Sequence, residues 1–509
     1  MNLSLLIIII YLLLVLGLGF WANLLLKKTG EDYFVASRTI GPFLLLMSLF
    51  GTNMTTFAIL GSSGEAYHEG IGVFGLMASI SALVMPCIFF FVGTRVWALG
   101  KRFGYLTQVQ YFRERWGSDR LGLLLFAVLI ALLVPYLLIG VMAGGIIIQN
   151  LTGGPAEGLP QWIGSVGISG VVLGYVFLGG LRGTAWANAF QTLVFMTLGA
   201  LAFFAVVNDL GGLRTAMGAV AEKFPHLLHR AGDGDAHPGM SPWLFLSYTF
   251  TPLSVGMFPH MFMHWLTARR METFRTTLVF YPFCIAAVWL PSVLLGVIAT
   301  ADPAIPFLEG ARSNSVLILL ISNHASPLLA GLLGAGVLAA AMSSLDSQFL
   351  SAGTMFTHDI VIHYKFHDRL DEKTQVRLGR AFVSLIVVIT LLLSFFTERS
   401  IFNLAVWSFA GFAGLFPVIV AALFWKRSTR YGALSSVLTV AIFWTYLFLQ
   451  GWETRGYTVG GTGIMPVAVL VLASAVGMIV GSLLSSPPSD ATLKKFFPGG
   501  KPSAAEVKT

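Results

Sequence analysis

Charged residues and cysteines are both scarce in this chain. Only 11% of its 509 residues are Asp, Glu, Lys or Arg, whereas an ordinary soluble domain carries roughly 25%. Hydrophobic residues make up 56%, more than the interior of a soluble chain of this length could hold. Cys87 and Cys284 both lie in apolar runs and form no disulfide or metal-binding pattern. The composition therefore excludes a soluble enzyme, a secreted disulfide scaffold, a nucleic-acid binder and a disordered chain as the main interpretation.

Long apolar runs are what the chain has instead. A helix of about 20 apolar residues crosses the roughly 30 Å hydrocarbon core of a bilayer. About 13 such runs are present, which predicts an all-α polytopic membrane protein. The predicted spans cover residues 2–26, 41–66, 71–98, 119–151, 160–181, 184–208, 241–267, 275–300, 325–358, 380–397, 401–425, 431–450 and 463–485.

Basic residues are unevenly distributed between the two sides of the predicted membrane. When the N-terminus is placed outside, about 25 of the 31 Lys and Arg fall in inside segments and about six in outside segments. This bias predicts an outside N-terminus and a cytoplasmic tail over 486–509. It also explains the net charge of +8 without a nucleic-acid partner.

Glycine, proline and small polar residues interrupt the second and seventh predicted spans. The interruptions lie at 51–56 and 61–64 in the second span, and at 251–256 and Pro259-His260 in the seventh. Irregular backbone at this depth is tolerated only where protein or a water-filled cavity satisfies its polar groups. Because the breaks lie five spans apart, the second copy is inverted relative to the first. The pair predicts an inverted repeat with a binding site at the breaks, with two simple kinks as the alternative.

The ninth span places three serines and an acid within two helical turns. Ser343, Asp346 and Ser347 share one face by their i, i+3, i+4 spacing. Hydroxyls of this kind, together with carbonyls freed by an unwound helix, offer the several oxygens that a hard cation such as sodium needs. Serines that merely pack against another helix are the alternative. Asp346 is harder to dismiss, because an intramembrane carboxylate is costly without a partner or a task.

Four stretches of the chain resemble the sodium:solute symporter family, whose members carry sugars, proline, pantothenate, sialate and monocarboxylates with sodium. The resemblance covers about residues 30–430. The stretches are Glu31 to Arg38, which is similar to the loop after the first helix; Tyr105 to Gly117, similar to an inner surface helix; Gly179 to Trp186, similar to the turn between the fifth and sixth spans; and Ala339 to Ile360, similar to the ninth span.

This resemblance implies the LeuT-type fold of two inverted five-helix repeats after one extra N-terminal helix. A single transmembrane domain over 1–485 would then have four parts. They are the extra helix and its loop (1–40), the first repeat (41–208), the second repeat (241–425) and two C-terminal helices (431–485), with the tail 486–509 following.

The resemblance also implies a sodium site between the second and ninth spans. Carried over residue by residue, its ligands are the carbonyls of Gly51, Met54 and Ala340 and the hydroxyls of Ser343 and Ser344. Two hydroxyls and three carbonyls match the oxygen number expected from the residues themselves.

One departure from the family pattern bears on the number of sodium ions. The family usually has Trp-Thr-Asp-x-x-Gln at the start of the sixth span, whereas this chain has Trp186-Ala187-Asn188-Ala189-Phe190-Gln191. In relatives with a second sodium ion, that Asp helps to bind it. Asn188 removes the charge and therefore favours one sodium per cycle. Asp346 is the candidate for compensating the lost charge, and Asn188, Asp346 and Ser347 form the predicted coupling group.

Side chains at the two breaks are the candidates for contacting the solute. The Pro259-His260 pair is more similar to the proline and organic-acid branch of the family than to the sugar branch. The predicted substrate-binding residues are Asn53, Thr55, Thr56, Ser254, Phe258 and His260. A packed or water-facing His260 is the alternative. A metal pair with His264 is disfavoured, because no clustered acid accompanies it.

Two further positions lie near the predicted outer side. Glu65 lies near the outer end of its span and is expected to be solvated. Trp407 and Ser408, in the eleventh span, either form part of an outer gate or pack at a helix interface.

Energetics favours a solute without net charge. One elementary charge crossing 100 mV supplies about 2.3 kcal/mol, and a tenfold sodium gradient adds about 1.4 kcal/mol. One sodium ion can therefore concentrate a neutral or zwitterionic solute several hundredfold. A monoanion carried with one sodium moves no net charge and retains only the roughly tenfold term.

We therefore predict a sodium-coupled symporter that imports a small, amino-acid-like solute by alternating access across the cell membrane. Sodium is the transported ion, and the solute and the lipid bilayer are the expected partners, with no obligate protein partner. The alternatives are a symporter of a sugar or organic acid, a proton-coupled carrier and a solute sensor. A membrane-embedded enzyme using His260, His264 or Asp346 is disfavoured, because no nucleophile–base arrangement accompanies them.

Overall fold

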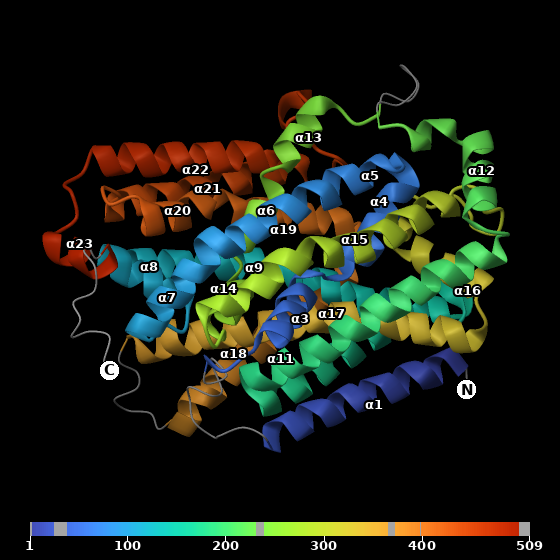
Figure 1. Ribbon diagram of the computed structural model, residues 1–509, viewed down its shortest axis with the longest axis horizontal. Helices are drawn as coiled ribbons and strands as arrows, with labels where there is room; N and C mark the ends of the chain where they lie inside the picture. The colour runs from blue at the N-terminus through green and yellow to red at the C-terminus, as the bar shows by residue number, and fades with distance from the viewer. Residues whose placement is uncertain (1–2, 25–37, 231–238, 365–371, 398, 498–509) are drawn as a thin grey trace.

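The computed structural model describes residues 3–24, 38–230, 239–364, 372–397 and 399–497, and this part of the chain is a bundle of helices (Figure 1). Eleven of its helices are long and apolar enough to cross a membrane. A twelfth span is formed if the pair Pro42–Asn53 and Phe57–Glu69, bent by 59°, counts as one. The first family stretch, over 31–37, lies outside the described residues, as do Lys27, Lys28 and the tail beyond 497.

The first half of the bundle runs from α1 to α12. Its helices are α1 (Leu3–Leu24), α3 (Pro42–Asn53), a π-helical turn (Phe57–Gly61), α4 (Ser62–Glu69), α5 (Gly72–Phe74), α6 (Ile80–Ile88), α7 (Thr94–Phe103), α8 (Gln108–Trp116), α9 (Asp119–Leu151), α10 (Gly154–Glu157), α11 (Gln161–Asp209) and α12 (Leu213–Lys223). Within α11, Gly180 has φ 53° and ψ −159°, a backbone conformation that glycine adopts at little cost. The glycine motif is therefore the turn between the fifth and sixth spans, as predicted.

The second half contains a span that is broken into short pieces. Its helices are α13 (Pro242–Tyr248), a 3-10 turn (Thr251–Gly256), α14 (Pro259–Leu266), α15 (Phe274–Ala299), α16 (Val316–His324), α17 (Pro327–Met355) continued by a π-helical segment (Phe356–Ile362), α18 (Glu372–Phe396), α19 (Ile401–Gly414), α20 (Phe416–Phe424), α21 (Arg430–Gly451), α22 (Pro466–Leu483) and α23 (Asp490–Phe496). Pro252 and Pro259 divide the expected span 241–267. This division is why fewer than 13 continuous spans are found.

Small residues and serines of α17 pack in the centre of the bundle, whereas α1 and α18 lie at its edge. Large apolar side chains such as Leu83, Phe283, Phe396 and Leu449 are exposed on the outer faces of the helices. Such exposure suits contact with lipid. We name the two ends of the bundle the α8 end and the α12 end, after the helices that lie there (Figure 1).

Arg115, in the second family stretch, holds helices together at the α8 end. Its side chain is fully buried, and its Nε donates to the Ala422 carbonyl at 3.1 Å while Nη2 donates to the Trp425 carbonyl at 3.3 Å. These carbonyls end α20, where a helix has unpaired acceptors and a partial negative charge. The arginine therefore joins α8 to the C-terminus of α20.

His324 links three segments at the α12 end. Its Nδ1 lies 2.7 Å from Asp209 Oδ2, at the end of α11, and its Nε2 lies 2.8 Å from Asp302 Oδ2, after α15. Burial by itself lowers the pKa of His324, but the hydrogen bonds and charges of the two carboxylates outweigh it and raise the pKa above its usual value. The protonated imidazolium of His324 therefore stabilises the contact between these three segments.

We expect this contribution to be full below the ordinary histidine pKa of about 6.5 and to be lost as the pH rises through the raised pKa. His324→Gln should lower the free energy of unfolding by about 1 kcal/mol at about pH 6 and hardly at all at about pH 9. Thermal denaturation of the purified protein at both pH values measures this. The exposed His229, changed to Gln, is the control, and an equal loss at both pH values would contradict the assignment.

Candidate functional site

The first break releases a backbone carbonyl in the middle of the second span. Helix α3 ends at Asn53, and Met54 has φ −87° and ψ 84°. The Met54 amide donates to the Phe50 carbonyl at 2.8 Å, so the carbonyl of Gly51 lies beyond the last helical hydrogen bond. At this depth a free carbonyl needs another partner.

Ser343 of α17 supplies that partner. Its Oγ lies 2.9 Å from the Gly51 carbonyl oxygen and 3.1 Å from the Ala340 carbonyl oxygen, and it donates to one of them at a time. All three residues are buried. The structure thus brings together three of the five residues predicted to bind sodium, from segments almost 300 positions apart.

The other two predicted ligands lie at the edges of this group. Ser344 is buried, and its Oγ accepts a hydrogen bond from Gln348 Nε2 at 2.7 Å. Met54 lies at the break itself, and among the described residues its carbonyl forms no hydrogen bond to α17. Their roles as ligands stay a prediction.

The second break is shaped by backbone hydrogen bonds. The amides of Met257 and Phe258 both donate to the Ser254 carbonyl, at 2.9 and 3.1 Å. Phe258 is extended (φ −66°, ψ 123°) and precedes α14. Ser254 therefore contributes its backbone to the break, whereas Phe258 and His260 contribute rings to the centre of the bundle.

A buried cluster of unpartnered polar atoms lies beside this break. The His260 ring is fully buried between Phe258, stacked at 5.2 Å between centroids, and Tyr136, at 5.6 Å. Both ring nitrogens of His260, the Tyr136 hydroxyl and Gln348 Oε1 form no hydrogen bond of ordinary geometry within the described residues. The Tyr136 hydroxyl lies close to the side chains of Ser344 and Gln348. Unpaired buried polar atoms are costly and are often found where a ligand binds.

Tyr136 and Gln348 were not among the residues predicted from the sequence. Gln348 lies one helical turn after Ser344 on α17, and this i, i+4 spacing was the available signal. Tyr136 lies in α9, next to Pro135, in a span without any other distinguishing pattern. Its position against His260 depends on how α9 packs, which the sequence does not express.

Three predicted substrate-binding residues have partners within the protein. Asn53 Nδ2 donates to the Tyr281 hydroxyl at 2.7 Å. Thr55 Oγ1 accepts from the Phe57 amide at 3.0 Å, and Thr56 Oγ1 donates to the Ile139 carbonyl at 3.4 Å. In this conformation they hold the break in place, and a role toward the solute stays a prediction.

The predicted coupling group forms one continuous polar network. Ser347 Oγ donates to Asp346 Oδ1 at 2.9 Å, and the Tyr175 hydroxyl donates to Asp346 Oδ2 at 3.0 Å. Asn188 Nδ2 donates to Ser347 Oγ at 2.9 Å. All four side chains are buried, so the network joins α11 to α17 away from water.

His264 extends this network to the first broken helix. Its Nε2 lies 3.1 Å from Ser347 Oγ, and its Nδ1 lies 2.9 Å from Ser48 Oγ on α3. Donors and acceptors match along the chain when Nε2 carries the proton. Both nitrogens of His264 are used here, and no group of three or more His, Cys, Asp or Glu in the described residues could hold a metal ion.

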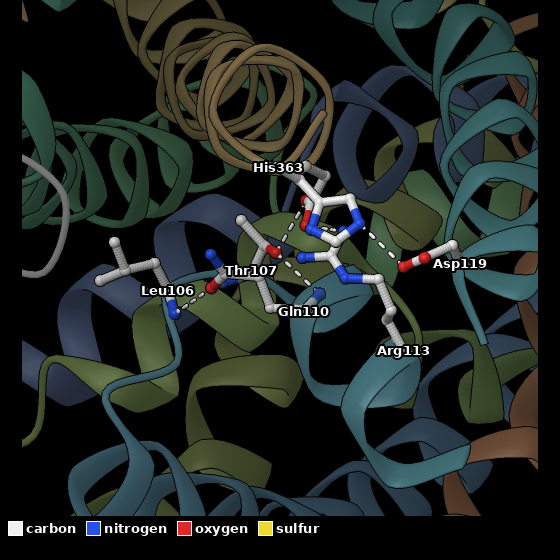
Figure 2. Close-up of polar contacts among 7 residues, drawn as sticks. Leu106, Thr107, Gln110, Arg113, Asp119 and His363 are labelled. Atoms are coloured by element: carbon white, nitrogen blue, oxygen red, sulfur yellow. Dashed lines mark hydrogen bonds and ion pairs between the residues drawn. The ribbon is translucent and has the colours of Figure 1, made fainter. Parts of the chain in front are cut away.

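Helix α8 contacts both the second break and the π-helical continuation of α17 at the α8 end. Figure 2 shows Thr107, Gln110 and Arg113 at the beginning of α8 and within it. Gln108 Nε2 donates to the Met257 carbonyl at 3.1 Å. Thr107, which caps α8, donates to Asp359 Oδ2 at 2.8 Å, and Arg113 Nη1 lies 3.7 Å from Asp359 Oδ1. These contacts join α8 to both segments.

Two broken helices that meet a buried set of oxygens, within a bundle of spanning helices, define a secondary transporter. The sequence model of the sodium:solute symporter family matches residues 33–439. The chain therefore belongs to the sodium:solute symporter family, a family of transporters and not of enzymes. Its fold is the LeuT type, and sodium is the coupling ion of the family.

Relatives of known sequence match the chain over most of its length. It is 26% identical to the uncharacterized symporter YhjB of Bacillus subtilis (strain 168), covering 88% of this chain and 89% of the relative. It is 24% identical to the osmoregulated proline transporter OpuE of the same organism, with 96% of each covered. It is 23% identical to the sodium/proline symporter of Escherichia coli (strain K12), covering 96% and 94%.

Two solved structures share the fold. One is a sodium-coupled sialic acid symporter in a substrate-bound, outward-open state, with a TM-score of 0.75, 17% identity, and 96% of this chain and 99% of that chain covered. The other is Mhp1, a nucleobase-cation-symport-1 family transporter in a closed conformation, with a TM-score of 0.59, 13% identity, and 92% and 99% covered. The inverted-repeat architecture predicted from the sequence is thereby confirmed.

The tight packing around Gly51 allows the contact between α3 and α11 to be tested by substitution. A Cβ added at Gly51 would lie 2.1 Å from Thr192 Oγ1 and 3.1 Å from the Asn188 carbonyl oxygen. We expect Gly51→Ala to displace α3 from its partners, with a destabilisation of about 1–3 kcal/mol and loss of sodium-dependent transport.

Thr192→Ala added to Gly51→Ala should restore part of the stability, because it removes the nearer obstruction and leaves the carbonyl. Melting temperature and uptake are measured for both variants and for Thr192→Ala alone. A Gly51→Ala protein with unaltered melting temperature and uptake would disprove the tight contact.

Proposed function

We propose that this chain imports a neutral or zwitterionic, amino-acid-like solute together with one sodium ion. The observation that carries the proposal is the Ser343 hydroxyl on the carbonyl of Gly51 at the end of α3. It supports a sodium site formed by the carbonyls of Gly51, Met54 and Ala340 and the hydroxyls of Ser343 and Ser344. The similarity to proline carriers supports the choice of solute class.

The chemistry of this oxygen set suits sodium. When sodium binds, the Ser343 hydroxyl turns its hydrogen away from the carbonyls of Gly51 and Ala340, because the ion and the hydrogen need the same carbonyl lone pairs. The Ser344 oxygen keeps acceptor capacity, since its present partner, Gln348, donates to it. Ion binding is thereby linked to the contact between α3 and α17, so that the ion stabilises the conformations in which this contact is made.

The polar atoms beside the second break suit the solute. His260, Tyr136 and Gln348 offer donors and acceptors in a buried, aromatic surrounding, the usual character of a small-molecule site. Gln348 also contacts Ser344. We propose that this contact couples solute binding to the sodium site.

The basic residues expected at the α8 end support an orientation of the protein in the membrane. We propose that the α8 end faces the cytoplasm, in agreement with the basic residues expected there. Asp359, Gln108 and their partners would then form the inner gate. Opening it requires the Gln108–Met257 contact to break, which frees the second broken helix to move.

The buried carboxylate of Asp346 supports an alternative to coupling by one sodium ion alone. Its carboxylate is fully buried, and within the described ranges no Lys or Arg forms an ion pair with it. A buried carboxylate with hydroxyl partners can take up a second cation or a proton during the cycle. Asn188, which replaces a carboxylate in this region, favours the single-ion stoichiometry that we propose.

The double variant Ser343→Ala with Ser344→Ala tests the sodium site. We expect the sodium concentration for half-maximal uptake of L-proline into proteoliposomes to rise at least about tenfold, because two oxygens of a charged ligand set are lost. Thr354→Val, which removes a buried hydroxyl bonded within the same helix, is the control. Wild-type uptake that persists without sodium, or follows a proton gradient instead, would contradict sodium coupling.

Sodium stoichiometry tests the role of Asp346. We expect a Hill coefficient for sodium near one in the wild type, since Asn188 carries no charge, and the same value in Asp346→Asn. Initial uptake rates over a range of sodium concentrations measure it. A wild-type coefficient approaching two that falls to one in Asp346→Asn would instead show that Asp346 binds a second sodium ion.

A further inference from the structure

Helix α23, at the C-terminal end of the described chain, lies beside α8 (Figure 1). Residues 484–489, which include Pro487 and Pro488, separate it from α22. Isolated helices shorter than about 12 residues are only marginally stable in water. The short helix α23 must therefore be stabilised by the surface on which it packs.

One aromatic side chain anchors α23 on that surface. The Phe496 side chain is buried, and its ring centroid lies 5.8 Å from that of Phe103, at the end of α7. The same ring lies 6.0 Å from that of Tyr111, which is itself buried in α8. Removal of Phe496 from water therefore depends on α7 and α8 staying where they are.

The rings of α23 and of the next residue also contact the guanidinium of Arg115. The centre of this guanidinium lies 5.9 Å from the Phe496 ring centroid and 5.0 Å from that of Phe497. A cation beside an aromatic face gains electrostatic attraction. Because Arg115 is bound to the carbonyls that end α20, α23 docks at the place where α8 and α20 meet.

An ion pair links α23 to the beginning of α8. Lys495 Nζ lies 2.6 Å from Glu114 Oε2, and the same oxygen accepts a hydrogen bond from the Tyr105 hydroxyl at 2.9 Å. Tyr105 precedes by two positions Thr107, which caps α8 and donates to Asp359. The lysine of α23 is thus connected, through Glu114 and Tyr105, to the segment that contacts α17.

We propose that α23 restrains α8. While α23 is docked, it keeps α8 in the position where Gln108 reaches the Met257 carbonyl and Thr107 reaches Asp359. When α23 is released, α8 separates more readily from both segments. As a restraint on the inner gate this inference rests on the proposed function, because these contacts form a gate only in a transporter.

The charge pair makes the restraint sensitive to salt. The side chains of Lys495 and Glu114 are 41% and 44% exposed, and ion pairs at such positions are weakened as the ionic strength rises. The aromatic contacts of Phe496 carry no such dependence. A change of ionic strength at the α8 end therefore alters how firmly α23 holds α8, without removing the contact.

A buried cysteine on α8 reports whether the helix has moved. Val109 is fully buried in α8, so Val109→Cys is introduced into a chain whose Cys87 and Cys284 are replaced by alanine. The purified protein in lipid nanodiscs is treated with N-ethylmaleimide. We expect Phe496→Ala to raise the labelling rate at least about tenfold, because a buried aromatic contact is lost. Phe496→Leu, which keeps an apolar side chain, should raise it less.

The two neighbouring lysines of α23 supply a matched pair of variants. Lys495→Gln should raise the labelling rate by up to about fivefold, the effect of losing one exposed ion pair. Lys494→Gln removes the same charge from an exposed side chain that forms no ion pair within the described residues, and should leave the rate unchanged. Potassium chloride raised from about 0.05 to 0.5 M should speed labelling in the parent but not in Lys495→Gln.

Cys284, buried in α15, is the control for general loosening of the bundle. In a chain with Cys87→Ala and without Val109→Cys, its labelling rate should be the same with and without Phe496→Ala. An equal rise at Cys284 would overturn the restraint, because α23 would then stabilise the whole bundle and not the position of α8.

The remaining outcomes separate the restraint from the proposed function. Sodium-driven uptake of L-proline by the parent, with equal Val109→Cys labelling in the parent, Phe496→Ala and Lys495→Gln, overturns the restraint alone. Faster labelling in both variants of a parent that does not transport L-proline overturns the proposed function, while the restraint on α8 stands. An equal rise in Lys494→Gln and Lys495→Gln contradicts the assigned ion pair.

Discussion

The constraint on which this structure depends is that a backbone carbonyl within the bilayer cannot be left without a partner. The break after α3 creates this problem at Gly51, and the Ser343 hydroxyl solves it from α17. Beside this contact, the packing of α3 against α11 requires a residue without a side chain at position 51, because Thr192 of α11 occupies the adjacent space. The atoms that hold the two helices together are also those that we propose for sodium, so ion binding and helix contact share the same oxygens.

A second polar layer lies on the same helices. From Ser48 through His264 and Ser347 to Asp346, hydrogen bonds connect α3, α14 and α17, and Asn188 adds α11. Buried networks of this kind are stable only when their donors and acceptors match, and here a single protonation state of His264 matches them. The carboxylate of this layer lies on α17, whereas α11 carries only an amide at the position where the family usually has Asp.

The two ends of the bundle differ in their packing. At the α8 end, Gln108 and Asp359 tie α8 to the second break and to α17. At the α12 end, a cavity reaches down to Phe402, whose ring stacks on that of Phe57. The centre is therefore separated from the two ends by unlike barriers, hydrogen bonds on one side and rings on the other. Alternating access needs two barriers that open separately, and barriers of different chemistry can respond to different events.

The spanning helices, the two breaks and the serines of α17 follow from the sequence by itself, because apolar run length, proline, glycine and helical spacing are local properties. The family follows from it as well, through short motifs such as the turn at Gly180. Only the tertiary structure decided that Asn53 pairs with Tyr281 and that Tyr136 lies between His260 and Gln348. It also decided that Glu65, expected to be solvated, is only 12% exposed and pairs with Arg455. These contacts join residues that are far apart in the chain, and neither spacing nor composition records which face of one helix meets which face of another.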